Sequence, residues 1–273
     1  MVHVSIAPEI LFTVLGIPVT NTLLTSWVVM VILIVVSIII SRNIKEIPGK
    51  LQNMTEIILT KLADFLETIA GSKETVRKFF PVAATIFIFI LCANWIGILP
   101  GVGSIGFTHK EEPSTLIEEE TKRETGEVIE AEKIEEPKES FVPLLRSVNS
   151  DLNMTLALAL IIVTMSHIVG LVTIGARDHI SKFFSFKSPI KFFVGLLEFI
   201  SELAKIISFS FRLFGNVFAG EVLLVIIAFL VPYIAPIPFL GLEIFVGFIQ
   251  ALIFTVLTMM FLGAATASHT EAH

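Results

Sequence analysis

The ionisable residues that indicate chemistry lie in a long apolar run between about Ile190 and Val231, which contains no proline. Arg212 stands near the middle of this run. Its guanidinium group stays protonated in proteins, and such a charge at the centre of a bilayer costs at least about 2.5–3.5 kcal/mol. A cation at that depth indicates a site on an ion pathway. The alternative is an arginine nearer the membrane surface, whose side chain extends to water.

Several polar residues share one face of a helix with Arg212. At about 100° per residue they fall within about 40° of it, and they are Glu198, Ser201, Lys205, Ser208 and Asn216. Gly215 and Ala219 flank this face, and small residues allow another helix to approach closely. Glu221 lies about 180° from Arg212 on the same helix. The run is therefore predicted to present a cation to one neighbour and a carboxylate to another.

A further carboxyl group lies in the last apolar segment, which is predicted to be helical from about Phe239 to Ala267. Glu243, Gly247 and Gln250 follow one another at helical spacing and share a face. The prolines of PYIAPIP, just before this segment, predict a turn. Residues 190–267 thus predict a helical hairpin. Its first helix, of about forty residues, would span about 60 Å, twice the hydrocarbon thickness, so strong tilt is expected.

The composition is that of a membrane protein. Of the 273 residues, 54% are hydrophobic and only 16% are charged, whereas soluble domains carry about 25% charged residues. Several apolar runs of about 20 residues predict membrane-spanning helices, and the alternating segments of a membrane barrel are absent from the sequence. We expect an all-α polytopic membrane protein with about five membrane-embedded helices, forming a single domain over residues 1–273.

The basic residues predict the orientation. Arg42, Lys45 and Lys50 follow the first span, about Leu23 to Ile40, and an excess of positive charge marks the cytoplasmic side. The N-terminus is therefore expected outside and the C-terminus in the cytoplasm. The N-terminal residues lack the basic segment of a signal peptide, so the first span is expected to be retained. Further spans are predicted near residues 80–99 and 152–174.

Two segments differ from the spans. Residues 51–71 place apolar residues at helical spacing with charged residues between them, which predicts an amphipathic helix at the cytoplasmic surface. The alternative is a helix packed against a soluble partner. Residues 103–147 are crowded with glutamate and almost free of aromatic residues. They predict an exposed, disordered, extracytoplasmic insert.

Other polar residues have more than one interpretation. Asp151 and Asn153 stand at the start of the third span, where they are expected to line an outer aqueous entrance. The alternative is that Asp151 or Asn149 caps the helix. Asn94 and His167 lie within other spans, and each is expected to hydrogen-bond to a neighbour. Lys205 is expected to pair with one of the two glutamates that precede it on its helix, a structural role.

The sequence contains no G-x-x-x-x-G-K-[ST] phosphate loop and no credible metal cluster or Ser-His-Asp arrangement. We therefore expect no covalent chemistry, no cofactor, no metal and no nucleic-acid partner. Two other functions remain as alternatives to an ion pathway. One is a secondary ion-coupled transporter, for which inverted repeats with interrupted helices are expected, but the sequence shows no two matching halves. Another is a structural membrane scaffold, whose polar residues only join helices.

The stretch FRLFGNVFAGE, residues 211–221, resembles the characteristic sequence of subunit a of F-type ATP synthase, the membrane stator with the proton path. PLLRSVNSDLNMTLALAL, residues 143–160, has a similar Pro, Arg, Asp and Asn pattern to that family. Glu243 and Gln250 match a polar pair at seven-residue spacing, whose first member varies between histidine and glutamate. The acidic insert is a departure, because family members often have a shorter connection.

The resemblance implies a non-catalytic subunit of the bacterial plasma membrane. Its implied partners are a ring of c subunits, the b subunits of the peripheral stalk and the rest of the ATP synthase. On the basis of this resemblance, we hypothesise that Arg212 stabilises the ionised form of the ring carboxylates. Because it keeps its own proton, Arg212 would also separate two half-channels. The other residues of the path would be Glu221 and Glu243 as outer relays, Asn216 and Gln250 holding Arg212 or ordered water, and Glu198 and Glu202 in the inner half-channel.

Overall fold

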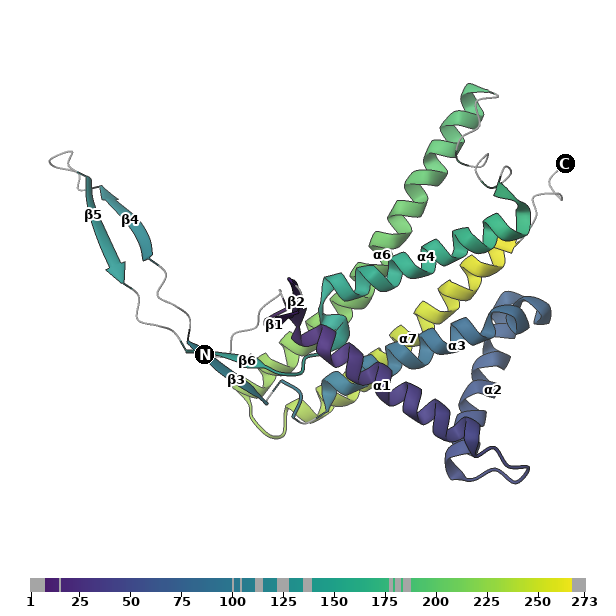
Figure 1. Ribbon diagram of the computed structural model, residues 1–273, viewed down its shortest axis with the longest axis horizontal. Helices are drawn as coiled ribbons and strands as arrows, with labels where there is room; N and C mark the ends of the chain where they lie inside the picture. The colour runs from purple at the N-terminus through teal and green to yellow at the C-terminus, as the bar shows by residue number, and fades with distance from the viewer. Residues whose placement is uncertain are drawn as a thin grey trace.

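The computed structural model describes residues 8–14, 16–99, 101–103, 105–110, 115–121, 128–134, 139–176, 179, 183 and 188–266. Its body is a set of long helices that diverge from a common region (Figure 1). They are α1 (Asn21–Arg42), α2 (Lys50–Ala70), α3 (Lys73–Ile98), α4 (Leu152–Ile174), α6 (Pro189–Leu230) and α7 (Pro236–Thr266). All of these except α2 are long and apolar enough to cross a bilayer. The prediction of an all-α polytopic membrane protein is confirmed.

The helices begin where local capping permits. The side chains of Thr20, Ser72 and Asp151 each accept a hydrogen bond from a backbone N–H in the first turn of α1, α3 and α4. The cap at Ser72 starts α3 several residues before the span expected near residue 80. The start of α4 agrees with the sequence, because Asp151 acts as its N-cap.

The run with Arg212 forms α6, a single helix of 42 residues. Pro189 occupies its first turn, where a missing N–H is tolerated. At about 1.5 Å per residue α6 is about 63 Å long, about twice the hydrocarbon thickness. The prediction of one unbroken helix is confirmed, whereas its tilt remains a prediction from this length. The N-terminal part of α6 extends away from the other helices (Figure 1).

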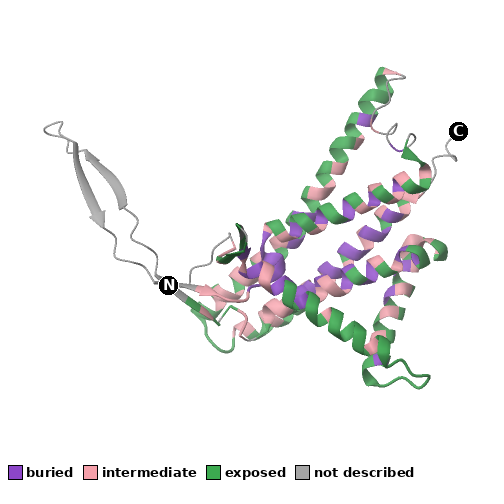
Figure 2. Ribbon diagram, in the orientation of Figure 1, coloured by how far each residue is buried: buried purple, intermediate pink, exposed green. Residues whose placement is uncertain are grey.

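The apolar core joins α3, α4, α6 and α7. Ile90, Ile162, Leu213 and Phe254 represent these four helices, and none is more than 2% exposed. Phe254 also meets the ring of Phe209 edge to face, with 5.1 Å between centroids. Buried positions run along α3 and α7, whereas α1 is mostly exposed (Figure 2). The core therefore fixes the rotation of the middle of α6 about its own axis.

A short 3-10 helix, η1 (Val148–Ser150), contacts α1, α3, α4 and α6. Three antiparallel strand pairs precede it in the chain: β1 (Ile10–Val14) with β2 (Ile17–Thr20), β3 (Gly106–Lys110) with β6 (Glu139–Pro143), and β4 (Thr115–Thr121) with β5 (Val128–Ile134). Residues 104, 111–114, 122–127 and 135–138 of the acidic insert lie outside the described residues. Its predicted disorder thus stays a prediction, but its last two residues, Arg146 and Ser147, are buried.

The amphipathic helix α2 contacts α3 and α7. It buries Leu62 and Leu66 and leaves a second apolar set exposed, namely Leu51, Met54, Ile57, Ile58 and Phe65. Such a set favours a position at the bilayer surface. The cytoplasmic side of α2 stays a prediction, and the C-terminal residues 267–273, expected on that side, lie outside the described residues.

Candidate functional site

Arg212 lies on the exposed side of α6. The next residue, Leu213, is fully buried in the core, so the guanidinium points away from it. Within the described part of the chain the guanidinium makes one hydrogen bond, from Nη2 to Ser208 Oγ at 3.4 Å. This distance is long for a hydrogen bond, and no described carboxylate forms an ion pair with Arg212.

The surface around Arg212 is also uncovered by the described chain. Ser201, Ser208 and Ala219 are exposed, and a Cβ added to Gly215 would meet no heavy atom within 4 Å. We call these four residues and Arg212 the arginine face. The sequence placed them on one side of the helix, and the structure shows that no other described helix of this chain covers that side.

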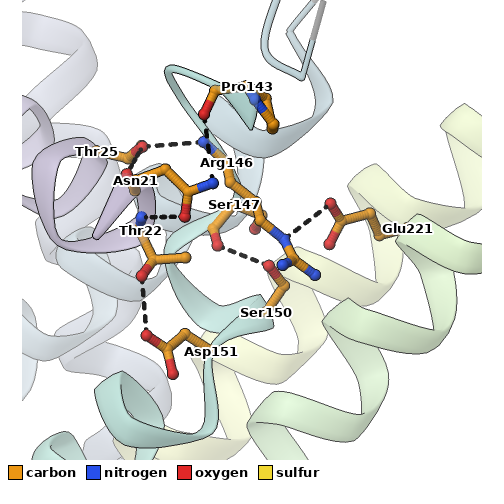
Figure 3. A network of polar contacts seen from close by, with 9 residues as sticks. All are labelled: Asn21, Thr22, Thr25, Pro143, Arg146, Ser147, Ser150, Asp151 and Glu221. Atoms are coloured by element: carbon orange, nitrogen blue, oxygen red, sulfur yellow. Dashed lines mark hydrogen bonds and ion pairs between the residues drawn. The ribbon is translucent and has the colours of Figure 1, made fainter. Parts of the chain in front are cut away.

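Glu221 lies on another side of α6 and pairs with Arg146. The Oε1 atom of Glu221 is 3.3 Å from Arg146 Nε, and the two side chains are 31% and 7% exposed. Arg146 stands just before η1, so the ion pair joins the connection that precedes α4 to α6. Figure 3 shows the guanidinium directed at the Glu221 carboxylate.

Residues 143–151, which we call the polar segment, are fastened to α1 (Figure 3). The hydrogen bonds run from Asn21 Nδ2 to Pro143 O at 3.3 Å, from Arg146 N to Thr25 Oγ1 at 3.2 Å, and from Thr22 Oγ1 to Asp151 Oδ2 at 2.8 Å. On the α3 side, Asn149 Nδ2 donates to Asn94 Oδ1 at 2.7 Å. The backbone that carries Arg146 is therefore held by two helices.

Glu243 of α7 lies against α6 beside Glu221. A Cβ added to Gly220 would lie 2.8 Å from Glu243 Oε1, so a glycine is needed for this approach. The two carboxyl groups are close enough for their charges to repel each other. In each of them Oε2 is buried without a hydrogen-bond partner among the described residues. We call Glu221 and Glu243 the carboxyl pair.

A small cavity adjoins the carboxyl pair. Its lining residues are Asn94, Asn216, Val217, Glu243, Val246, Gly247 and Gln250. Its free volume is about 10 Å³, close to the least that holds one water molecule. Asn216 Nδ2 donates to Gln250 Oε1 at 2.8 Å, and Gln250 Nε2 is buried without a partner among the described residues. Polar atoms of this kind around a cavity favour an ordered water.

A second ionisable group of residues joins α4 to α6. His167 Nδ1 is 3.2 Å from His179 Nε2, and His167 Nε2 is 3.7 Å from Glu202 Oε2. Lys205 Nζ is 2.7 Å from Glu202 Oε1. We call these four residues the histidine cluster. The expected pairing of Lys205 and the expected hydrogen bond of His167 are both confirmed, while Glu198 lies half-buried on the same helix.

The residues expected at the start of α4 have different surroundings. Asp151 is buried, and its Oδ1 accepts from the Asn153 N–H at 2.8 Å, so the capping interpretation is confirmed. Asn153 is exposed. Their proposed place at an aqueous entrance is untested. Asn94 bonds across helices as expected, because its Nδ2 donates to Gly247 O at 3.1 Å.

Arg146 was not predicted from the sequence as a member of the site. It was noted only as the arginine of the Pro, Arg, Asp and Asn pattern that resembles the family. The available signal was a single cation between an acidic insert and an apolar helix, five residues before the N-cap Asp151. An arginine in that position needs an acidic partner when the chain around it is buried.

The arrangement suits the binding and transfer of protons rather than covalent chemistry. Among the described residues, no three histidine, cysteine or acidic side chains form a group that could hold a metal ion. What the site offers is a half-buried carboxyl pair with a fixed arginine, a water-sized cavity and an exposed second arginine. Carboxyl groups and ordered water exchange protons readily.

The family model described as "ATP synthase A chain" matches residues 23–263. A protein named ATP synthase subunit a 1, from Syntrophotalea carbinolica, is 32% identical over 252 residues, which cover 91% of this chain and 85% of that protein. ATP synthase subunit a of Gloeobacter violaceus is 33% identical over 255 residues, covering 93% and 86%. ATP synthase subunit a of Campylobacter jejuni subsp. doylei is 32% identical over 241 residues, covering 87% and 86%.

Proposed function

Since this chain belongs to the ATP synthase subunit a family, whose members are membrane-sector subunits of F-type ATP synthase, we propose that it supplies the proton path to the rotor. Two half-channels would open to opposite membrane surfaces and end at a ring of c subunits. The b subunits of the peripheral stalk and the rest of the synthase are the other proposed partners. The N-terminus would lie outside and the C-terminus in the cytoplasm, in the bacterial plasma membrane.

The arginine face would lie against the ring. An ionised ring carboxylate alone in lipid is costly and takes up a proton instead. Beside Arg212 the ionised form is stabilised, so the ring releases its proton there. Arg212 keeps its own proton and therefore blocks direct transfer between the half-channels. In this way the ring must turn for a proton to cross.

The carboxyl pair and its cavity would form the outer half-channel. Glu243 and Glu221 bind protons, while Asn216 and Gln250 hold water between them and the arginine face. Asp151 and Asn153, near the polar segment, stand toward the outer entrance. The support for this assignment is that buried, unpartnered carboxyl oxygens adjoin a water-sized cavity.

The inner half-channel would pass Glu198 and Glu202. Glu202 belongs to the histidine cluster, which lies toward the other end of α4 from η1. The chain would itself carry out no covalent chemistry, because ATP is made elsewhere in the complex. It would therefore be a conducting rather than a catalytic subunit.

The observation that carries the proposal is that α6 presents an arginine that the described part of this chain leaves uncovered and, on another side, a half-buried carboxylate that pairs with Arg146. A scaffold has no need of a cation without a partner in its membrane region. A proton path that ends at a second protein does need such a cation.

The test is ATP-driven proton pumping in inverted vesicles that carry the assembled complex. We expect Arg212→Ala to abolish pumping while the complex remains assembled. Lys191→Ala, which removes an exposed cation near the start of the same helix, is the matched control and should pump normally. Normal pumping by Arg212→Ala would show that the site does not depend on Arg212 and lies elsewhere. Tolerance of both Arg212→Lys and Glu221→Gln would favour the scaffold.

A further inference from the structure

We propose that Arg146 is a positioning residue of the outer half-channel, which holds Glu221 as a fixed negative charge and leaves Glu243 as the group that takes up and releases the proton. The inference rests on the proposed function and deepens it. It gives the two carboxyl groups different tasks and adds a residue outside the last two helices to the path.

The first support is the ion pair itself. The Arg146 side chain is only 7% exposed and its Nε lies 3.3 Å from Glu221 Oε1. A charged group that is this deeply buried requires an opposite charge and hydrogen bonds. Its contact with Glu221 supplies the opposite charge, and the same contact fixes the direction of the Glu221 carboxylate.

The second support is the rigidity of the polar segment. The backbone N–H of Arg146 donates to Thr25 Oγ1 at 3.2 Å, and Asn149 and Asp151 are fastened to α3 and α1. A Cβ at Gly97 would come within 2.6 Å of Ser147 Cβ, so α3 approaches the segment closely. The backbone around Arg146 is thus held in place by α1 and α3, so the Arg146 side chain can hold Glu221 in place in turn.

The third support is the asymmetry of the carboxyl pair. Glu221 pairs with Arg146, whereas no described cation forms an ion pair with Glu243, whose carboxyl lies against Gly220 and lines the cavity. Two neighbouring carboxyl groups do not both stay ionised without compensation. One guanidinium compensates one of them. The proton that remains exchangeable therefore belongs on the group that faces the cavity, and it passes between that group and water.

The charged groups around this site come from several elements. The polar segment contributes Arg146 and Asp151, α6 contributes Glu221, and α7 contributes Glu243. Glu9, whose backbone oxygen accepts from Asn21 N at 3.1 Å, lies at the same end. The residues of α1 and α3 that contact the polar segment are uncharged. Asp151 is occupied by Thr22 and the N-terminus of α4.

The experiment measures passive proton conduction through the intact membrane sector in vesicles over a range of pH. We expect Arg146→Gln to slow conduction several-fold and to move the half-maximal rate to higher pH. Without the guanidinium the negative charge is less stabilised, so protons are released only at higher pH. Arg146→Lys keeps the charge and should restore most of the rate. Arg146→Gln with Glu221→Gln removes both charges and should return the midpoint toward the native one.

The control is Lys191→Ala, which removes an exposed cation near the start of α6 and should leave the midpoint in place. The inference is overturned if Arg146→Gln leaves the midpoint unchanged, or if Lys191→Ala moves it equally. If Arg146→Gln fails to assemble, Glu221→Gln alone decides: it leaves the guanidinium without its partner charge, so the midpoint should move to lower pH, and an unchanged midpoint contradicts the inference. Normal conduction by Glu243→Gln and Glu221→Gln would instead defeat the proposed function.

Discussion

Two polar sites on α6 differ in how far this chain completes them. Glu221 is enclosed: a fixed arginine lies 3.3 Å away, and Glu243 approaches through the gap left by Gly220. Arg212 has only the 3.4 Å contact with Ser208 among the described residues. The helix is the same, so the difference comes from what packs against each side of it.

The difference between the sites of Glu221 and Arg212 bears on which side of α6 a partner protein would bind. A charge in a membrane segment is stable when another charge or water compensates it. Under the proposed function, the enclosed site takes only protons and water from outside, whereas the arginine face receives a carboxylate from the ring. The two sites would then serve conduction and exchange with a moving partner.

The largest effect is expected at the exposed site. Arg212→Lys keeps a cation but replaces a group that never loses its proton with one that does when desolvated. ATP-driven pumping in vesicles should fall by about tenfold or more if the proposed function holds, because a lysine would not keep the proposed half-channels separate. Assembly, measured by subunit content of the purified complex, should be normal. Native pumping would show that any positive charge serves, and the contrast between the two sites would weaken.

A smaller effect is expected when the enclosed site is crowded. Gly220→Ala places a Cβ 2.8 Å from Glu243 Oε1, so the Glu243 carboxyl must move away. Passive proton conduction should fall several-fold with the complex intact. Gly241→Ala in α7 adds the same methyl group where nothing lies within 4 Å, and should conduct normally. Equal behaviour of the two variants would mean that the placement of Glu243 does not matter.

The smallest effect is expected in the histidine cluster. Lys205→Met removes a cation that is 32% exposed and lies 2.7 Å from Glu202 Oε1. Partly exposed ion pairs of this kind contribute about 0.2–1 kcal/mol, so thermal stability of the complex should change little. Pumping should stay within about twofold of native, since roughly 0.4 kcal/mol corresponds to that factor. A loss comparable to that of Arg212→Lys would place Lys205 on the path itself.

The division of α6 into two sides was predictable from the sequence. Helical geometry alone separates Arg212 from Glu221, and the absence of proline over forty residues indicates one helix. Leu213 and Phe209 are buried where that geometry implies a core-facing side. The paired glutamate and lysine at positions 202 and 205 are likewise local, since three residues separate them.

The partner of Glu221 was not predictable in the same way. Arg146 reaches it from a part of the chain 75 residues earlier, and only the return of the polar segment between α1 and α3 brings them together. Helical spacing carries no information about such a contact. The same holds for the hydrogen bond from Asn216 to Gln250 on α7, because the spacing within each helix does not reveal it.

The three hydrogen bonds between α1 and the polar segment join residues that are 121 to 129 positions apart in the chain. During synthesis, α1 enters the membrane long before its partners exist. At about 5–20 residues per second the interval is about 6–26 seconds. Through that time Asn21 and Thr22 lack these acceptors, so the N-terminal end of α1 must stay in contact with water or the insertion machinery. Helix α1 is thus made before the segment that holds its N-terminal end in place.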